Sequence, residues 1–229
     1  MGGKWKQRFE GLAAATPVTS RTLFFSEDNP DSQFFITVDG AAPALFDPNN
    51  PPAIVTTQGS VEEWTIQNRT LENHEFHMHQ IHFLVESQNN FEINGSQPYP
   101  AIQGQLADTI QIPFWDGNPS HPFPSVTLRM DFRGADVGDF VYHCHIAEHE
   151  DHGMMAIIRV EPSAMAAAIE TLRLELASLG QTLGLLSRPN PERIYGWCVQ
   201  GKLVRIRTTT NDDQTAARAR RISDAPTER

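Results

Sequence analysis

Two short windows of the chain hold eight of its nine histidines. The first window contains four of them: His74, His77, His79 and His82. The second window adds two sulfur side chains to four more histidines: His143, Cys144, His145, His149, His152 and Met154. Imidazole, thiolate and thioether groups together form the ligand set of a blue-copper site, in which two His, one Cys and a weak axial Met bind the metal. The windows therefore predict a copper site and redox chemistry at that copper.

The spacing within each window predicts how the ligands are divided. Residues two apart in a strand face the same side, so His77 and His79 share one face, and His143 and His145 share another. Cys144 then points to the opposite side of its strand. This arrangement predicts two metal sites separated by one backbone, one that uses Cys144 and one that uses the four flanking imidazoles.

The Cys144 site also needs two imidazoles and a soft axial group. His149 follows Cys144 by five residues and Met154 follows it by ten, so one loop can supply all three. Gly153 permits a tight turn before Met154. The more distant imidazole is most simply His74, just before the first His-x-His pair.

Length and composition favour an ordinary soluble domain. The 229 residues suffice for one good core and a small appendage. A formal net charge of −10 makes nucleic acid an unsuitable general partner, and we find no apolar run long enough to span a bilayer. Residues 1–16 lack the apolar core of a secretory signal, so we expect none, and the compartment stays open. We expect Cys198 to be free, because a bridge to Cys144 would consume the copper thiolate.

Residues 20–162 are predicted to form an all-β domain after an N-terminal extension over residues 1–19. Short runs rich in Val, Ile, Thr and Phe alternate with polar residues, and Gly, Pro, Asn and Asp clusters separate them. The nine candidate strands are 22–26, 34–38, 53–57, 61–68, 76–86, 109–114, 125–132, 139–143 and 154–161. This number and spacing predict a Greek-key β-sandwich.

The periodicity changes after Pro162. Apolar residues then recur at alternating steps of four and three: Met165, Ile169, Leu172, Leu176, Leu179, Leu183 and Leu186. This heptad pattern predicts an amphipathic helix over residues 163–187. We favour packing of the helix on its own sandwich, and a zipper between copies of the chain is the alternative. Residues 188–229 are predicted to be a basic, partly disordered tail with a small irregular or β segment at 197–207.

The two windows closely resemble the C-terminal cupredoxin domain of the multicopper oxidases, the laccase-like family. The matching motifs are His74-x-x-His77-x-His79 and His143-Cys144-His145-x-x-x-His149-x-x-x-x-Met154. Residues 127–133 and 138–145 also look typical, and the resemblance extends over roughly residues 20–162. It implies a cupredoxin-like sandwich and an oxidoreductase that uses copper, O2 and a small reducing substrate. The family is often periplasmic or secreted.

The resemblance also implies a role for each ligand. Type 1 copper would be bound by His74, Cys144, His149 and Met154. Type 2 copper would be bound by His77, and the type 3 pair by His79, His143 and His145. Electrons from the reducing substrate would enter at type 1 copper and pass through Cys144 and its neighbours to the trinuclear cluster, where O2 is reduced to water.

The chain departs from the family in its histidine count. The family's trinuclear cluster uses eight histidines, and this chain supplies only the four assigned to the cluster above. It has no histidine upstream of His74. Three interpretations stay open. A second cupredoxin domain, from another chain or a second copy of this one, supplies the rest. Alternatively, the chain is a single-copper electron carrier or copper-binding module, or it is an inactive fragment of an oxidase.

The other residues of the windows receive weaker predictions. We expect His82 to be a packed or hydrogen-bonded histidine, His121 to lie on the surface, and His152 to be no ligand. O2 reduction consumes protons, so a carboxylate near the cluster is useful. Glu150 adjoins His149, and the hypothesis is that it relays protons, although a solvated loop carboxylate is the simpler interpretation.

Overall fold

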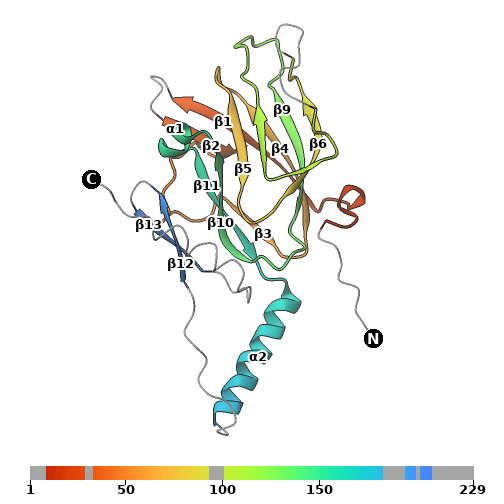
Figure 1. Cartoon of the computed structure of the whole chain (residues 1–229), viewed down its shortest axis with the longest axis vertical. Helices are drawn as coiled ribbons and strands as arrows, with labels where there is room; N and C mark the ends of the chain where they lie inside the picture. Colours follow the sequence, from red (N-terminus) through yellow and green to blue (C-terminus); the bar gives the residue numbers. More distant parts are fainter. Residues whose placement is uncertain (1–8, 29–32, 93–100, 183–193, 200–201, 208–229) are drawn as a thin grey trace, which may run out of the picture.

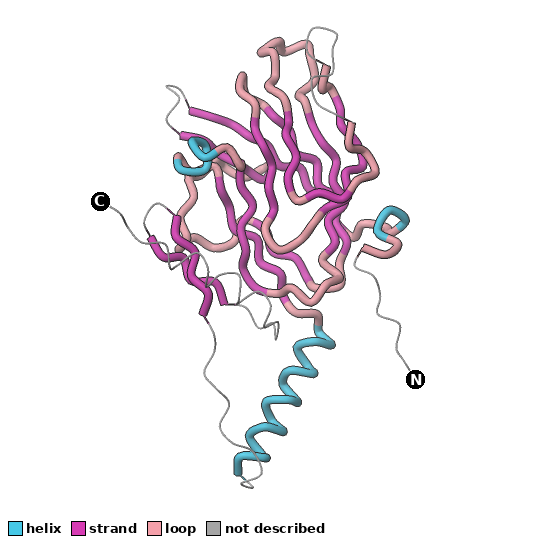
Figure 2. Tube along the Cα trace, in the orientation of Figure 1, coloured by secondary structure: helices cyan, strands magenta, loops and turns pink. Residues whose placement is uncertain are grey.

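The computed structural model describes residues 9–28, 33–92, 101–182, 194–199 and 202–207. Strands make up most of the molecule, and one long helix extends away from them (Figure 1, Figure 2). One sheet has six strands in the order β2-β1-β4-β9-β6-β7, and the other has five in the order β3-β11-β10-β5-β8. The strands of the first sheet are β1 (Thr19–Asp28), β2 (Gln33–Val38), β4 (Val61–Asn68), β6 (Phe83–Asn89), β7 (Leu106–Ala107) and β9 (Ser125–Asp131). Those of the second are β3 (Ile54–Thr57), β5 (His74–Met78), β8 (Thr109–Ile112), β10 (Gly138–Cys144) and β11 (Met155–Glu161).

The hydrophobic core lies between the two sheets. Strand alternation sends every second side chain inward, as in β4, where Trp64 and Ile66 are fully buried. The largest buried side chains come from both sheets and include Phe25, Trp64, Phe76, Phe83 and Tyr142. Trp64 contacts both Phe76 and Tyr142 edge to face across the core. The same core reaches Cys144, so the predicted ligand lies at its edge.

Two strands replace the single strand that the sequence predicted over residues 76–86, so that prediction is wrong. β5 belongs to one sheet and β6 to the other. Between them Gln80 adopts a left-handed backbone with φ of 73°, and the N–H of Ile81 donates to the carbonyl of His79. This tight turn carries the chain from one sheet to the other. Buried apolar residues occupy even positions before the turn (Phe76, Met78) and odd positions after it (Ile81, Phe83), so the alternation changes phase at Gln80. This change of phase is the signal in the sequence that marks the break.

The helix α2 (Ala164–Thr182) begins after Ser163, whose hydroxyl accepts the N–H of Ala166. The described residues of the heptad pattern are 55–75% exposed: Met165, Ile169, Leu172, Leu176 and Leu179. The expectation that this stripe packs on its own sandwich is therefore wrong for these residues. Leu183 and Leu186 lie outside the described residues, and the zipper stays a prediction.

The predicted fold class, an all-β sandwich followed by a C-terminal helix, is confirmed. Short helices η1 (Leu12–Ala14) and α1 (Ala147–Asp151) and the hairpin β12 (Ile194–Val199) and β13 (Lys202–Arg207) complete the elements. The predicted disordered tail lies outside the described residues, as does the side chain of Cys198. Within the described part of the chain, no helix has the length and apolar character needed to cross a membrane.

Candidate metal centre

The antiparallel strands β5 and β10 bring the two histidine windows together. Cys144 pairs with Phe76, and His143 pairs with His77. Directly paired residues share a face, so Cys144 faces the core with Phe76, whereas His143 and His77 lie on the opposite face of the sheet. His74, three residues before His77, is fully buried on the core side. The geometry therefore divides the ligands between two sites on either side of one sheet.

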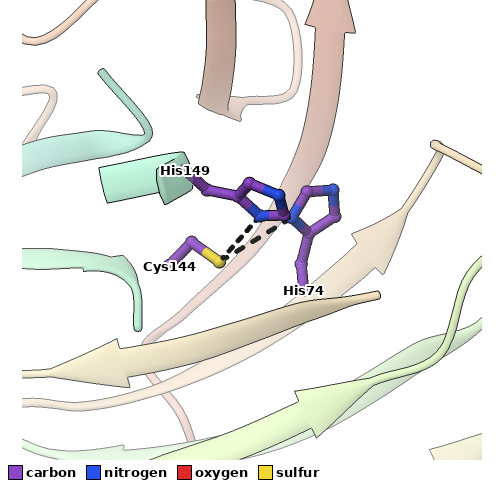
Figure 3. A group of neighbouring side chains, drawn as sticks. All are labelled: His74, Cys144 and His149. Carbon is purple, nitrogen blue, oxygen red and sulfur yellow. Dashed lines mark hydrogen bonds between the residues drawn. The ribbon is translucent and has the colours of Figure 1, made fainter. Parts of the chain in front are cut away.

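The site on the core side joins three residues (Figure 3). The Sγ atom of Cys144 lies 3.7 Å from Nδ1 of His74 and 3.6 Å from Nδ1 of His149. The two Nδ1 atoms are 3.0 Å apart. Metal–nitrogen and metal–sulfur bonds of about 2.0–2.3 Å make these separations compatible with one shared ion. All three side chains are buried, and Cys144 and His74 completely so.

The segment that follows Cys144 turns back on itself to hold His149 and Met154. His149 lies in α1, its carbonyl accepts the N–H of Met154, and the carbonyl of Met154 accepts the N–H of Cys144. Gly153 has φ of 106°, and a Cβ there would lie 2.6 Å from a methyl group of Leu45. Only glycine fits this turn without strain. Met154 is fully buried, and its backbone is hydrogen bonded to both Cys144 and His149.

One loop supplies partners for the outer nitrogens of both imidazoles. Nε2 of His74 lies 2.8 Å from Oγ1 of Thr70, and Nε2 of His149 lies 3.1 Å from a carboxylate oxygen of Glu72. When both Nδ1 atoms bind a metal, each Nε2 carries a proton and donates a hydrogen bond to one of these oxygens. Such partners fix the tautomer and ring orientation of metal-binding histidines. Neither residue belongs to a ligand pattern, so the sequence did not predict a role for either.

Two phenylalanines from the hairpin of β1 and β2 cover the same imidazoles. Phe25 stacks on His74 with ring centroids 4.8 Å apart, and Phe34 stacks on His149 at 4.3 Å. Burial lowers the pKa of His74 to about 3, and it also lowers the pKa of His149. Both rings are therefore neutral at pH 7, which is the form that binds metal. These phenylalanines were also missed, since the core of any sandwich is rich in such residues.

The Cys144 thiol needs a cation to ionise. Burial raises its pKa to about 11, while backbone N–H donors act in the opposite direction. The N–H of Glu75, 3.4 Å from Sγ, is one of these donors. A bound metal deprotonates a coordinating thiol, and neutral imidazole with thiolate is a soft donor set that suits copper. The chemistry of the donor set thus fits the predicted ion.

The second group lies on the opposite face of the sheet. Ligand atoms of His77, His79 and His143 lie within 4.8 Å of one another, and Nε2 of His79 is 3.1 Å from Nε2 of His143. The ring of His145 is 5.0 Å from His77 and 5.6 Å from His143 between centroids. Burial lowers the pKa of His79 to about 4, and the neighbouring imidazoles add to this effect. Four imidazoles therefore gather where side-chain alternation predicted them.

This second group has its own hydrogen-bond partners. Nδ1 of His77 lies 2.8 Å from Oγ1 of Thr109, and Nδ1 of His143 lies 2.9 Å from the carbonyl oxygen of Cys144. A carboxylate oxygen of Glu150 lies 3.2 Å from Nδ1 of His143. Burial raises the pKa of Glu150. The carboxylate is thus close to the group, on the Nδ1 side of His143.

The remaining histidines lie outside both groups. His82 is half exposed and 3.9 Å from a carboxylate oxygen of Asp108. His121 is exposed and pairs with Asp116 at 2.6 Å. His152 is exposed, and its Nδ1 lies 2.6 Å from the carbonyl oxygen of Glu148.

A β-sandwich with cysteine and imidazole ligands on one side of a strand and clustered imidazoles on the other belongs to the copper-binding cupredoxin class. The sequence pattern of the family described as "Multicopper oxidase" matches residues 15–164, so the chain belongs to the multicopper oxidase family. Copper is its cofactor.

Several known proteins are similar to this chain over part of their length. A "Laccase" of Bacillus subtilis is 32% identical over 109 residues, which cover 42% of this chain and 20% of the laccase. A "Multicopper oxidase mco" of Staphylococcus haemolyticus is 31% identical over 151 residues, or 63% of this chain and 28% of that protein. A solved multicopper oxidase from Campylobacter jejuni, described as a metallo-oxidase, aligns with 25% identity and a TM-score of 0.49, covering 64% of this chain and 31% of that one. The chain thus spans less than a third of each of these relatives.

Proposed function

We propose that residues 20–162 act as the type 1 copper domain of a multicopper oxidase. In this proposal His74, Cys144, His149 and Met154 hold the copper that takes single electrons from a small reducing substrate. The observation that supports it most is the convergence of Cys144 Sγ and two imidazole Nδ1 atoms within 3.7 Å in a buried site. When bound, copper supplies reversible one-electron redox chemistry.

The protein's own residues prepare this site. Thr70 and Glu72 hold the outer nitrogens of the two imidazoles, and burial keeps both rings neutral. The stacked Phe25 and Phe34 exclude water from the same rings. A dry, rigid ligand set limits the rearrangement that accompanies a change of charge at the metal.

The strand β10 provides the path from this site to the second one. Cys144 is covalently bonded to His143 on one side and His145 on the other, and both histidines face the second group. We propose that electrons leave through these bonds. His77, His79, His143 and His145 would then hold half of a type 2 and type 3 trinuclear copper cluster, at which O2 is reduced to water.

The second half of that cluster must come from elsewhere. The chain supplies four imidazoles, and the side chain of His145 is 55% exposed. We propose that a second cupredoxin domain, from another chain or a second copy, covers it. Glu150, 3.2 Å from His143, would pass protons to the oxygen chemistry.

A single-copper electron carrier is the second candidate. Its support is that the Cys144 site is complete within this chain, whereas the outer group is open. In that case the four imidazoles of the second group bind no catalytic copper cluster.

Copper per chain, measured on copper-loaded protein and resolved by oligomer size, tests these functions. About one copper per chain, with blue absorption, supports the carrier or a domain that awaits its partner. About 2.5 per chain in a dimer supports one cluster shared by two copies. No blue copper in any fraction contradicts both and leaves an inactive fragment.

A further inference from the structure

The helix α2 exposes an apolar stripe that the proposed function does not use. Met165, Ile169, Leu172, Leu176 and Leu179 are 55–75% exposed, and the helix extends away from the sandwich (Figure 1). A helix of this length is only marginally stable by itself in water, because most helices in proteins depend on the packing of their apolar face. Among the residues that the structure describes, the sandwich does not cover this stripe. The stripe therefore needs a partner.

The spacing of the stripe indicates the kind of partner. Its steps of four, three, four and three residues keep a period of 3.5, which is the period of a left-handed coiled coil. Ile169 and Leu176 then occupy the a positions, and Met165, Leu172 and Leu179 occupy the d positions. A β-branched residue at a with leucine at d favours two parallel helices. A second copy of α2 presents the same stripe and fits this pattern.

The positions beside the stripe are compatible with pairing of two identical helices. The e positions hold Ala166, Arg173 and Gly180, and the g positions hold Ala168 and Glu175. None of these is a large apolar residue, whereas a helix that packs on a core adds apolar residues at e or g. In a parallel pair each e position faces the g position five residues earlier on the other copy. Arg173 then meets Ala168, and Glu175 meets Gly180, so no like charges face each other.

A membrane surface suits α2 less well than a second copy does. The charged residues of the helix are Glu170, Arg173 and Glu175, so its net charge is −1. Helices that lie on membranes carry lysine and arginine on their polar face, which anionic lipids attract. Leu174 also lies on the face opposite the stripe and is 62% exposed.

Pairing through α2 leaves the candidate metal ligands uncovered. Only Pro162 and Ser163 separate α2 from β11. At this end of β11 Val160 pairs with Gly138, whereas Met155 at the other end pairs with His143. Five residues of strand, or about 17 Å, therefore separate the helix from the histidines of β10. The stripe and the metal sites are thus distinct features of the chain.

We infer that α2 joins two copies of this chain as a parallel coiled coil, with the five apolar residues of the stripe as its seam. The inference goes beyond the proposed function and needs no copper at either site. Its consequence is that two sandwiches, each with its own two groups of ligands, are held near one another at the high effective concentration of tethered domains.

Sedimentation of the full copper-free chain over about a hundredfold range of concentration tests the pairing. The wild-type protein should reach twice the 25.6 kDa of one chain. Leu172→Glu should raise the dimer dissociation constant at least about thirtyfold, because it places two like charges in the seam. Leu174→Glu is the matched control, since this exposed leucine lies on the opposite face, and its effect should stay within about threefold. A wild-type protein that is monomeric at every concentration, or equal weakening by both substitutions, overturns the inference.

Disulfide cross-linking tests the parallel orientation. Cys198→Ser removes the other cysteine outside the candidate metal site, and Leu179→Cys or Leu174→Cys is then added. A parallel pair places the two copies of residue 179 opposite one another, near the Cα separation of about 4.4–6.8 Å that a disulfide requires. Oxidation should therefore link Leu179→Cys chains much faster than Leu174→Cys chains. Equal rates, or no link through residue 179 in a dimer, overturn the parallel coiled coil.

The same sedimentation on copper-loaded protein separates this inference from the proposed function. The dimer mass and its dissociation constant should be unchanged by copper. A dimer without blue absorption contradicts the proposed function and supports the coiled coil. A blue protein that remains monomeric overturns the coiled coil, and binding of that monomer to phosphatidylglycerol vesicles would assign the stripe to a membrane surface instead.

Discussion

Cys144 and His143 are consecutive residues of β10, yet their side chains lie on opposite faces of the sheet. Sγ of Cys144 meets His74 and His149 in the core, while Nε2 of His143 meets His79 on the outer side at 3.1 Å. One peptide unit thus separates the two candidate metal sites. Alternation along a strand is the physical reason, since neighbouring side chains point in opposite directions.

Cys144→Ser should abolish the blue colour of copper-loaded protein. The thiolate is the donor that gives type 1 copper its strong absorption, and a serine hydroxyl does not replace it. The visible absorption spectrum measures the effect, and the small change in volume leaves the core nearly intact. A blue Cys144→Ser protein would contradict the assignment of this site.

Met154→Leu should keep the blue colour and raise the reduction potential. An axial thioether bonds weakly and favours copper(II), whereas leucine of similar volume only packs. A redox titration of the blue absorption measures the shift. Complete loss of copper from this variant would show that Met154 does more than occupy the axial position.

Glu150→Gln should lower the rate of O2 reduction by about 10²-fold, because a positioned proton donor or acceptor contributes at least that much. The isosteric amide preserves the space beside His143, so blue colour should be unchanged. Oxygen consumption by the assembled oxidase is the measurement, with reduction of the blue copper as the control step. Unchanged activity across pH would remove Glu150 from the mechanism.

Acid should destabilise the copper-free protein through His74. Its pKa falls from 6.5 to about 3 on folding, because it is buried. Between these values the unfolded chain binds the proton and the folded one does not, so stability is present above pH 6.5 and is lost as the pH falls. At pH 5 the loss is about 2 kcal/mol for one such histidine.

Denaturant unfolding of wild-type protein and His74→Asn at pH 7 and pH 5 measures this effect. The difference between the two pH values should shrink in His74→Asn and persist in His82→Asn, since His82 is half exposed. An equal pH dependence in all three proteins would contradict the origin of the effect in His74.

Leu172→Glu with Leu176→Glu should leave the unfolding free energy of the sandwich within about 0.5 kcal/mol of wild type, as surface substitutions usually do. Both side chains are about 60–70% exposed on α2. Leu128→Ala, a fully buried position of β9, is the control and should cost about 2–5 kcal/mol. A large loss in the double variant would mean that α2 stabilises the sandwich after all.

The sequence alone predicted the candidate ligand types and their division between two groups of side chains. Spacing of His143, Cys144 and His145 was sufficient, because strand alternation is a local property of the backbone. The all-β class followed in the same way from short alternating runs. The prediction of a single strand over residues 76–86 was wrong, because only one irregular position, Gln80, marks the change of sheet, through a one-residue shift in the phase of the apolar residues.

Only the tertiary structure decided which residues surround the ligands. Phe25, Phe34, Thr70 and Glu72 contact His74 or His149 through the folding of strands and loops that no ligand motif marks. Local spacing fixes side-chain direction within one strand, whereas contacts between distant segments depend on how the sheets and loops pack.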